Sequence, residues 1–210
     1  MNGNFITFEG PDGAGKTSVL EAIVPKISSL IEQEIVVTRE PGGNNISESI
    51  RNLILDVDNS EMDSRTEALL YAAARRQHIV EKIQPALNRK AIVICDRFVD
   101  SSIAYQGAGR SIGEKLISDM NLFATDGLTP DLTIYLDVPS EVGLERIQKN
   151  RQNQYDRLDH EKLDFHKKVR KSYQNLMRNN TDRIKMIDAT QPFSEVVDSC
   201  MRELSKFLDN

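Results

Sequence analysis

The chain has 210 residues, 39% of them hydrophobic and 28% charged, and its formal net charge is −5. Such a composition is typical of a globular chain that buries one core, so we expect a single domain over residues 1–210. The acidic balance disfavours a nucleic-acid-binding surface, and the sequence has neither a signal peptide nor an apolar run of the ~18 residues that a membrane helix needs. We therefore expect a cytoplasmic protein that binds no nucleic acid and no membrane.

Short apolar runs alternate with helical patterns along the whole chain. The first run, at residues 5–8, precedes a pattern of apolar residues at three- and four-residue steps from Val19 to Ile31, which Pro25 is expected to kink. Further strands are predicted at 35–38, 91–95, 132–136 and 184–187. Further helices are predicted at 46–54, 63–87, 112–123, from Ser140, at 159–178 and at 193–208. This alternation predicts an α/β fold with a five-stranded parallel sheet and helices on both faces, in which ligands bind beyond the carboxyl ends of the strands.

One stretch between the first strand and the first helix fits the pattern G-x-x-x-x-G-K-[ST] of a phosphate-binding loop. Its glycines allow positive φ and bring backbone N–H groups close to an anion. In such loops the lysine reaches β- and γ-phosphate oxygens, and the final hydroxyl is a Mg²⁺ ligand. We therefore expect a nucleotide to bind at Gly10, Pro11, Asp12, Gly13, Ala14, Gly15, Lys16 and Thr17.

A carboxylate at the end of a buried strand is expected to complete the metal site. Asp96 follows the apolar run 91–95 and is favoured as a Mg²⁺ ligand, directly or through water. Asp137, which follows the run 132–136, is the alternative. Asp96 is preferred because a second cluster of polar residues follows it.

Arginines are frequent near the predicted strand ends and in one polar segment, at Arg39, Arg51, Arg75, Arg97, Arg146, Arg151 and Arg157. In an acidic chain, guanidinium groups around a phosphate loop predict a second anion beside the nucleotide, because the planar fork of arginine matches phosphate oxygens. Two phosphorylated ligands that face each other favour phosphoryl transfer, for which the protein supplies positive charge and alignment. The polar segment predicts a lid over about residues 146–158, which would bring an arginine to the transition state.

The cysteines and histidines suggest no further chemistry. Cys95 and Cys200 fall in apolar patterns and are expected to be buried thiols rather than a disulfide. His78, His160 and His166 have no zinc-like spacing, so we expect ordinary core or surface positions for them.

Several stretches beyond the phosphate loop resemble the bacterial type of thymidylate kinase, in the P-loop nucleoside monophosphate kinase family. In chain order these stretches are residues 8–17, 38–43, 96–107, 130–132 and 188–192. The resemblance implies a three-layer P-loop kinase fold with a short lid, and a homodimer. It also implies ATP- and Mg²⁺-dependent conversion of dTMP to dTDP, in dTTP biosynthesis for DNA replication.

The same resemblance implies a role for individual residues on the acceptor side. It places the dTMP phosphate against Arg39 and Arg97, with Glu40 nearby, and the stacking face of thymine against Tyr71. Tyr71 departs from the phenylalanine common at this position in the family, which preserves stacking but adds a hydroxyl group. Tyr105 would crowd the ribose 2′ position. The full set of implied substrate residues is Arg39, Glu40, Pro41, Arg51, Tyr71, Arg75, Arg97, Ser102, Tyr105 and Gln106, of which Arg75, Ser102 and Gln106 would read the polar edge of the base.

On the donor side, the resemblance places Asp12 near the 3′-hydroxyl of the acceptor or near the metal, and Arg146 near adenine. Some family members carry an arginine inside the phosphate loop, but residues 11–14 contain none here. The catalytic cation is therefore expected from the lid. The expected catalytic set is Lys16, Asp12, Arg97, Arg151 and Arg157.

Two other functions fit parts of the pattern. A deoxynucleoside kinase would phosphorylate thymidine itself and would need a carboxylate base, for which Glu40 is available. A nucleotide-dependent switch or sensor fits the phosphate loop alone, but the chain lacks the N-K-x-D motif of GTPase switches. Neither alternative accounts for the arginines on the acceptor side as well as a monophosphate kinase does.

Overall fold

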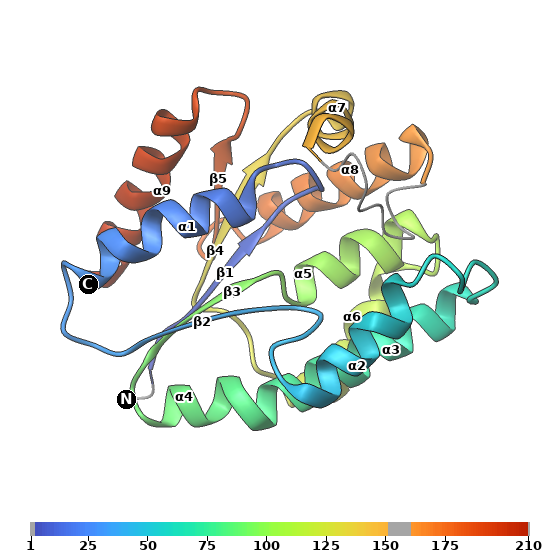
Figure 1. Cartoon of the computed structure of the whole chain (residues 1–210), viewed down its shortest axis with the longest axis horizontal. Helices are drawn as coiled ribbons and strands as arrows, with labels where there is room; N and C mark the ends of the chain where they lie inside the picture. The colour runs from blue at the N-terminus through green and yellow to red at the C-terminus, as the bar shows by residue number, and fades with distance from the viewer. Residues whose placement is uncertain (1–2, 151–160, 210) are drawn as a thin grey trace.

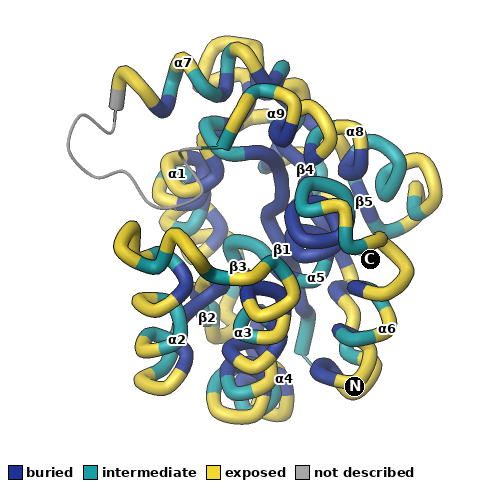
Figure 2. The backbone as a smooth tube through the Cα atoms, turned by 90° about the vertical axis from the view of Figure 1, so that its right-hand side faces the viewer, coloured by how far each residue is buried: buried dark blue, intermediate teal, exposed yellow. Residues whose placement is uncertain are grey.

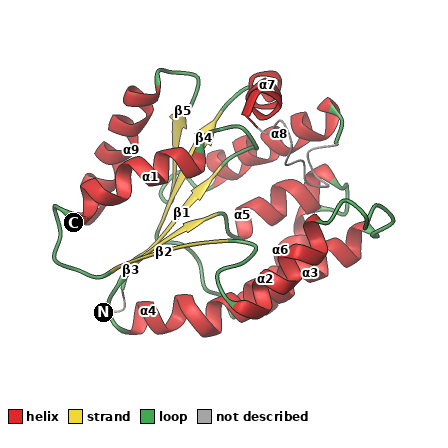
Figure 3. Ribbon diagram, in the orientation of Figure 1, coloured by secondary structure: helices red, strands yellow, loops and turns green. Residues whose placement is uncertain are grey.

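The computed structural model describes residues 3–150 and 161–209, with the Asn150 side chain left out. Its centre is a sheet of five parallel strands, whose arrowheads point to the same side of the molecule in Figure 3. The strands are β1 (Phe5–Glu9), β2 (Ile35–Arg39), β3 (Ile92–Asp96), β4 (Leu132–Asp137) and β5 (Ile184–Asp188). They pair in the order β2-β3-β1-β4-β5. The predicted five-stranded parallel sheet is therefore confirmed.

Helices cover both faces of this sheet, which confirms the three layers (Figure 1). The α-helices are α1 (Lys16–Ser28), α2 (Asn45–Leu55), α3 (Ser64–His78), α4 (Gln84–Asn88), α5 (Val99–Ser102), α6 (Glu114–Thr125), α7 (Ser140–Asn150), α8 (Leu163–Asn179) and α9 (Phe193–Leu208). Two π-helical segments, η1 (Ile79–Ile83) and η2 (Ile103–Gly109), extend α3 and α5. Among the described helices, none is both long and apolar enough to cross a membrane.

The sheet separates two apolar layers. On one face, residues of α1 and α9 such as Ile23 and Val197 pack against Ile6 and Ile134 of the sheet. On the other face, η1 and α4 pack against β3, and α8 packs against β4 and β5. Figure 2 shows the consequence, a buried sheet inside helices whose outer surfaces are exposed. Because residues 92–95 of β3 are buried between the two layers, they read as a continuous apolar run.

The helices differ from the predictions in four places. α1 ends at Ser28, three residues after Pro25, so the apolar pattern that continues to Ile31 lies outside the helix and Leu30 is exposed. The helix predicted over 63–87 is divided by η1, and the polar cluster after Asp96 is largely helical. The helix predicted from residue 159 begins at Leu163, and residues 159–160 lie outside the described part of the chain.

The register of the strands brings three loops to one edge. Asp96, at the end of β3, pairs with Phe8 of β1 and with Arg39 of β2. The residues that follow these strands therefore emerge at the same level. This placement brings Gly10, Arg39 and Arg97 together, as parallel strands require.

Candidate active site

The phosphate loop lies between β1 and α1. Gly10, Gly13 and Gly15 all have positive φ, of 142°, 76° and 88°. At Gly13 a Cβ atom would also overlap the backbone of Gly143, so only glycine fits there. Gly15 is the N-cap of α1, which directs the N-terminus of that helix into the loop.

Lys16 is buried at the start of α1. Its Nζ donates to the carbonyl oxygens of Gly10, at 3.0 Å, and Pro11, at 3.1 Å. Burial, and next the Arg97 guanidinium, lowers the pKa of Lys16 from 10.5 to about 8. The ammonium group is thus held inside the loop, where phosphate oxygens of a nucleotide are expected.

Asp96 and Thr17 meet beside this loop. The Thr17 hydroxyl donates to Asp96 Oδ2 at 3.2 Å, while the buried Asp96 Oδ1 has no hydrogen-bond partner among the described residues. Asp137, the alternative, instead accepts two hydrogen bonds from Arg170, at 3.0 and 2.8 Å. A hydroxyl and a carboxylate with an unpartnered oxygen suit a hard cation such as Mg²⁺, so the donor set fits at Asp96 and not at Asp137.

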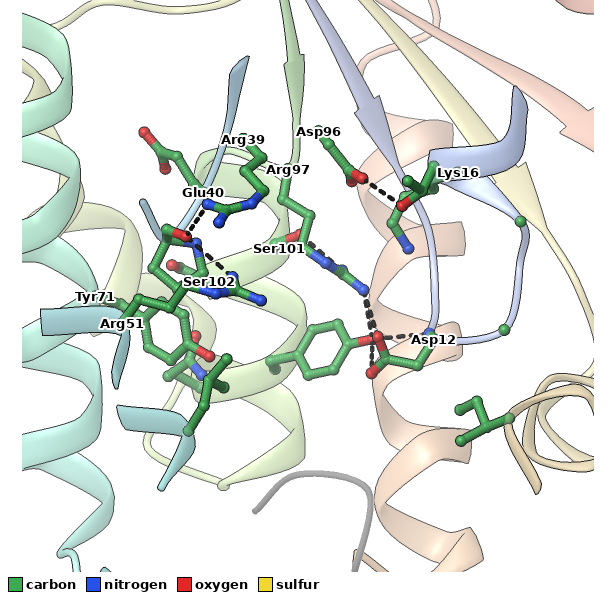
Figure 4. Close-up of a pocket in the computed structure, with 18 of the residues that line it drawn as sticks. Asp12, Lys16, Arg39, Glu40, Arg51, Tyr71, Asp96, Arg97, Ser101 and Ser102 are labelled. Atoms are coloured by element: carbon green, nitrogen blue, oxygen red, sulfur yellow. Dashed lines mark hydrogen bonds and ion pairs between the residues drawn. The ribbon is translucent and has the colours of Figure 1, made fainter. Parts of the chain in front are cut away.

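A cavity of about 490 Å³ opens at this edge of the sheet (Figure 4). Among the residues predicted for the site, those that line it are Asp12, Gly13, Gly15, Lys16, Thr17, Arg39, Glu40, Pro41, Arg51, Tyr71, Arg75, Asp96, Arg97, Ser102, Tyr105, Gln106 and Arg146. Gly10, Pro11 and Ala14 shape the loop behind the cavity without lining it. Arg151 and Arg157, with most of the predicted lid, lie outside the described residues.

Arg97 is fixed at the centre of the cavity. Its Nη2 contacts Asp12 Oδ1 at 2.6 Å, and its guanidinium carbon lies 5.0 Å from the centroid of the Tyr105 ring. The Tyr105 hydroxyl in turn donates to Asp12 Oδ2 at 2.7 Å. Arg97 has φ of 72°, a left-handed conformation that is costly for a side chain of this size and that recurs at functional sites. Figure 4 shows the guanidinium directed toward Asp12.

A buried carboxyl group behind Arg97 was not predicted. Glu9 Oε1 accepts from the backbone N–H of Phe98 at 2.7 Å, and Oε2 accepts from the hydroxyls of Ser101, at 2.5 Å, and Tyr173, at 2.9 Å. Ser101 Oγ and Tyr173 OH lie 3.1 and 3.4 Å from Arg97 Nη1. Burial raises the pKa of Glu9 to about 7, and Asp100 adds to this effect. A charged residue inside an apolar strand was the available signal.

The far wall of the cavity contains a second buried ion pair. Arg75 Nε donates to Glu40 Oε2 at 2.7 Å, and its Nη1 donates to Ser102 Oγ at 2.9 Å and to Asn121 Oδ1. His78 Nδ1 lies 3.0 Å from Glu40 Oε1. His78 occupies a core position, as expected, and lies behind the site, where it supports Glu40.

Gln106 belongs to a different network on the same side. Its Nε2 donates to Glu67 Oε1 at 2.9 Å, and Glu67 is also bonded by Arg110. Neither Glu67 nor Arg110 was predicted as a site residue. Tyr71 also lines the cavity and offers an aromatic face.

The remaining arginines lie at the rim. Arg39 is half exposed and bonded to Glu48, at 2.7 and 3.1 Å, and Arg51 Nη1 donates to the carbonyl of Pro41 at 3.0 Å. Arg146 Nη2 donates to the carbonyl of Ala189 at 3.0 Å. Arg146 therefore contacts the segment 188–192, beside which adenine was expected.

Both cysteines are free and buried, as predicted.

Comparison with known proteins agrees with this geometry. The family model for thymidylate kinase matches residues 8–200. The thymidylate kinase of Latilactobacillus sakei is 70% identical over 206 residues, which cover 98% of this chain and 96% of that protein. The thymidylate kinase of Pediococcus pentosaceus is 59% identical over 100% of both chains. The crystal structure of thymidylate kinase from Ehrlichia chaffeensis has a TM-score of 0.78 at 34% identity, and covers 98% of this chain and 99% of its own. The chain therefore belongs to the thymidylate kinase family.

Proposed function

We propose that this protein transfers the γ-phosphoryl group of ATP to dTMP, giving dTDP and ADP, as a step in the supply of dTTP for DNA replication. The single observation that carries this proposal is one cavity lined by both Lys16 of the phosphate loop and Arg97 beyond it. A nucleotide on the loop and a monophosphate on Arg97 would face each other within that cavity. The reaction then joins a phosphate oxygen of dTMP to the γ-phosphorus and breaks the bond to the β,γ-bridging oxygen.

This chemistry needs no general base, because a phosphomonoester is largely ionised at neutral pH, with a second pKa of about 6. The obstacle is repulsion between two anions. Lys16 and Arg97 offset it with positive charge at fixed positions, and Asp12 and Tyr105 hold the Arg97 guanidinium. Arg151 or Arg157, from the lid proposed over about residues 146–158, would supply a further cation at the transition state.

We propose that Thr17 and Asp96 hold Mg²⁺ beside the phosphates. The ion would neutralise charge on the donor phosphates, the chemistry that it supplies in related phosphoryl transfer. The support from this chain is the unpartnered Asp96 Oδ1 next to the Thr17 hydroxyl.

The acceptor nucleoside would occupy the far end of the cavity. Tyr71 would stack on thymine, while Arg75, Ser102 and Gln106 read its polar edge and Tyr105 crowds the 2′ position. Arg39, Glu40, Pro41 and Arg51 would surround the acceptor phosphate and sugar, and Arg146 would lie near adenine. These residues all line the cavity, which supports the assignment.

Phosphorylation of thymidine itself is less consistent with the structure. A neutral hydroxyl acceptor needs a base, and Glu40 was the candidate. Both Glu40 oxygens are already bonded, to Arg75 at 2.7 Å and to His78 at 3.0 Å, and the side chain is buried. A carboxylate held in this way is a poor proton acceptor for a substrate.

A panel of acceptors with ATP and Mg²⁺, with ADP release as the readout, tests the proposal. We expect ADP formation with dTMP and none with thymidine above the background without acceptor. ADP formation with thymidine but not with dTMP would overturn the proposed function.

We further propose one domain over residues 1–210, a cytoplasmic location and a homodimer, as the family resemblance implies. Exposed leucines on three helices, Leu53 of α2, Leu69 of α3 and Leu116 of α6, are consistent with a second copy packing there. Sedimentation velocity tests the homodimer, and a species of monomer mass over the working concentration range would reject it.

A further inference from the structure

Gln106 lines the acceptor end of the cavity but is buried, with only 2% of its surface exposed. Its amide can point in two directions, and the two directions offer a ligand opposite groups. One presents the Nε2 donor to the cavity, and the other presents the Oε1 acceptor. In the structure Nε2 donates to Glu67 Oε1 at 2.9 Å, and no described residue donates to Gln106 Oε1.

The chemistry of Glu67 requires this direction. Glu67 is fully buried on α3 and bonded by Arg110, with Nη2 3.0 Å from Oε2 and Nε 3.3 Å from Oε1. Arg110 is itself held by Glu161 and lies 5.1 Å from the centroid of the Phe165 ring. A carboxylate paired with a guanidinium is ionised, and an ionised carboxylate only accepts hydrogen bonds. The reversed amide would place two acceptor oxygens against each other in a buried site.

The oxygen that remains for the cavity selects its ligand. A pyrimidine-2,4-dione, as in thymine or uracil, carries an N–H at ring position 3 that can donate to Gln106 Oε1. Cytosine carries an unprotonated nitrogen at that position, so two acceptors would meet. A buried polar group left unpaired, or facing a like group, is strongly rejected.

We propose that Glu67, charged and held by Arg110, is a specificity-determining residue that fixes the Gln106 amide so that the site accepts pyrimidine-2,4-diones and rejects 4-aminopyrimidines. Glu67 acts through Gln106 and touches no substrate. The inference rests on the proposed function, since it concerns the base of the acceptor monophosphate.

The test is kcat/KM for dTMP and for dCMP in the wild type and in Glu67→Gln. The amide that this substitution introduces can donate or accept, so the Gln106 amide becomes free to turn its NH₂ group toward the cavity. We expect the ratio of kcat/KM for dTMP to kcat/KM for dCMP to fall by about tenfold or more, with the loss mainly in the KM for dTMP. Glu81→Gln is the matched control, because Glu81 accepts from Gln77 Nε2 at the same 2.9 Å on an exposed surface. Its ratio should equal that of the wild type.

A merely structural role for Glu67 predicts a different result, an equal loss for both substrates with the ratio unchanged, and that result would overturn the inference. If Glu67→Gln fails to fold, Glu67→Asp takes its place, because the shorter side chain keeps the charge beside Arg110 but withdraws the carboxylate from Gln106 Nε2, and its ratio must also fall. A wild type that makes no ADP with dTMP would reject the proposed function instead, so the two failures are distinguishable.

Discussion

Glu9→Gln tests the buried carboxyl group behind Arg97. Glu9 is fully buried, and its oxygens accept from Phe98, Ser101 and Tyr173. Among the charged groups near it, Asp100 raises and Arg97 lowers its pKa. Burial has the largest effect, and the result is a pKa of about 7 in place of 4.5.

The magnitude follows from this difference in pKa. A rise from 4.5 to about 7 corresponds to about 3 kcal/mol of stability. Because the pKa is higher in the folded state than in the unfolded state, the folded protein binds the proton more tightly. The contribution is therefore fully present below about pH 4.5 and is lost as the pH rises through about 7. Glutamine has nearly the same shape but does not titrate, so the variant lacks this pH dependence.

The assay is urea unfolding of wild type and Glu9→Gln at a series of pH values from about 4 to about 8. We expect the wild type to lose stability relative to the variant, by about 1.4 kcal/mol per pH unit within that window, and then to level off. Glu32→Gln, a change at an exposed carboxylate, is the matched control. Its difference from the wild type in the free energy of unfolding should change little over the same pH series. The reasoning would be refuted if the difference in the free energy of unfolding between wild type and Glu9→Gln stayed constant, or if it moved in favour of the wild type as the pH rises.

Three further predictions concern the site. Lys16→Ala should reduce kcat by about a thousandfold in the ADP-release assay, because it removes the cation that the loop holds against the donor phosphates, and a near-normal rate would remove the loop from the mechanism. Asp96→Asn should raise the Mg²⁺ concentration for half-maximal activity by about tenfold, and an unchanged Mg²⁺ titration would exclude Asp96 as a ligand. Glu40→Gln should lower the free energy of unfolding by about 3 kcal/mol, since it leaves the buried Arg75 without its carboxylate. A loss below about 1 kcal/mol in urea unfolding would show that the pair is not needed.

The strands and the phosphate loop could be predicted because their signals are local. A continuous apolar run such as 91–95 specifies a buried strand wherever its neighbours lie. The spacing of Gly10, Gly15 and Lys16 likewise specifies the loop directly. The strand order could not be predicted, because apolar strands of similar composition do not indicate which of them pair with one another.

The supports of the site could not be predicted because they depend on contacts between distant segments. Tyr173 lies on α8, and its hydroxyl reaches Glu9 across 164 positions of sequence. His78 and Glu67 are polar residues on the buried side of α3 and look ordinary until Glu40 and Gln106 face them. Neither α5 nor η2 was predicted as a helix. Glycine disfavours helices, and η2 contains Gly107 and Gly109.

The proposed function depends most directly on Arg97, which would hold the phosphate of the acceptor. The most direct measurement is the affinity of dTMP and of thymidine for wild type and for Arg97→Ala by calorimetry. Arg76→Ala, at an exposed arginine, is the control. We expect Arg97→Ala to weaken the binding of dTMP by about tenfold or more and to change the binding of thymidine little, because only dTMP carries the charge that Arg97 binds. Equal losses for the two ligands, or an unchanged affinity for dTMP, would contradict this expectation.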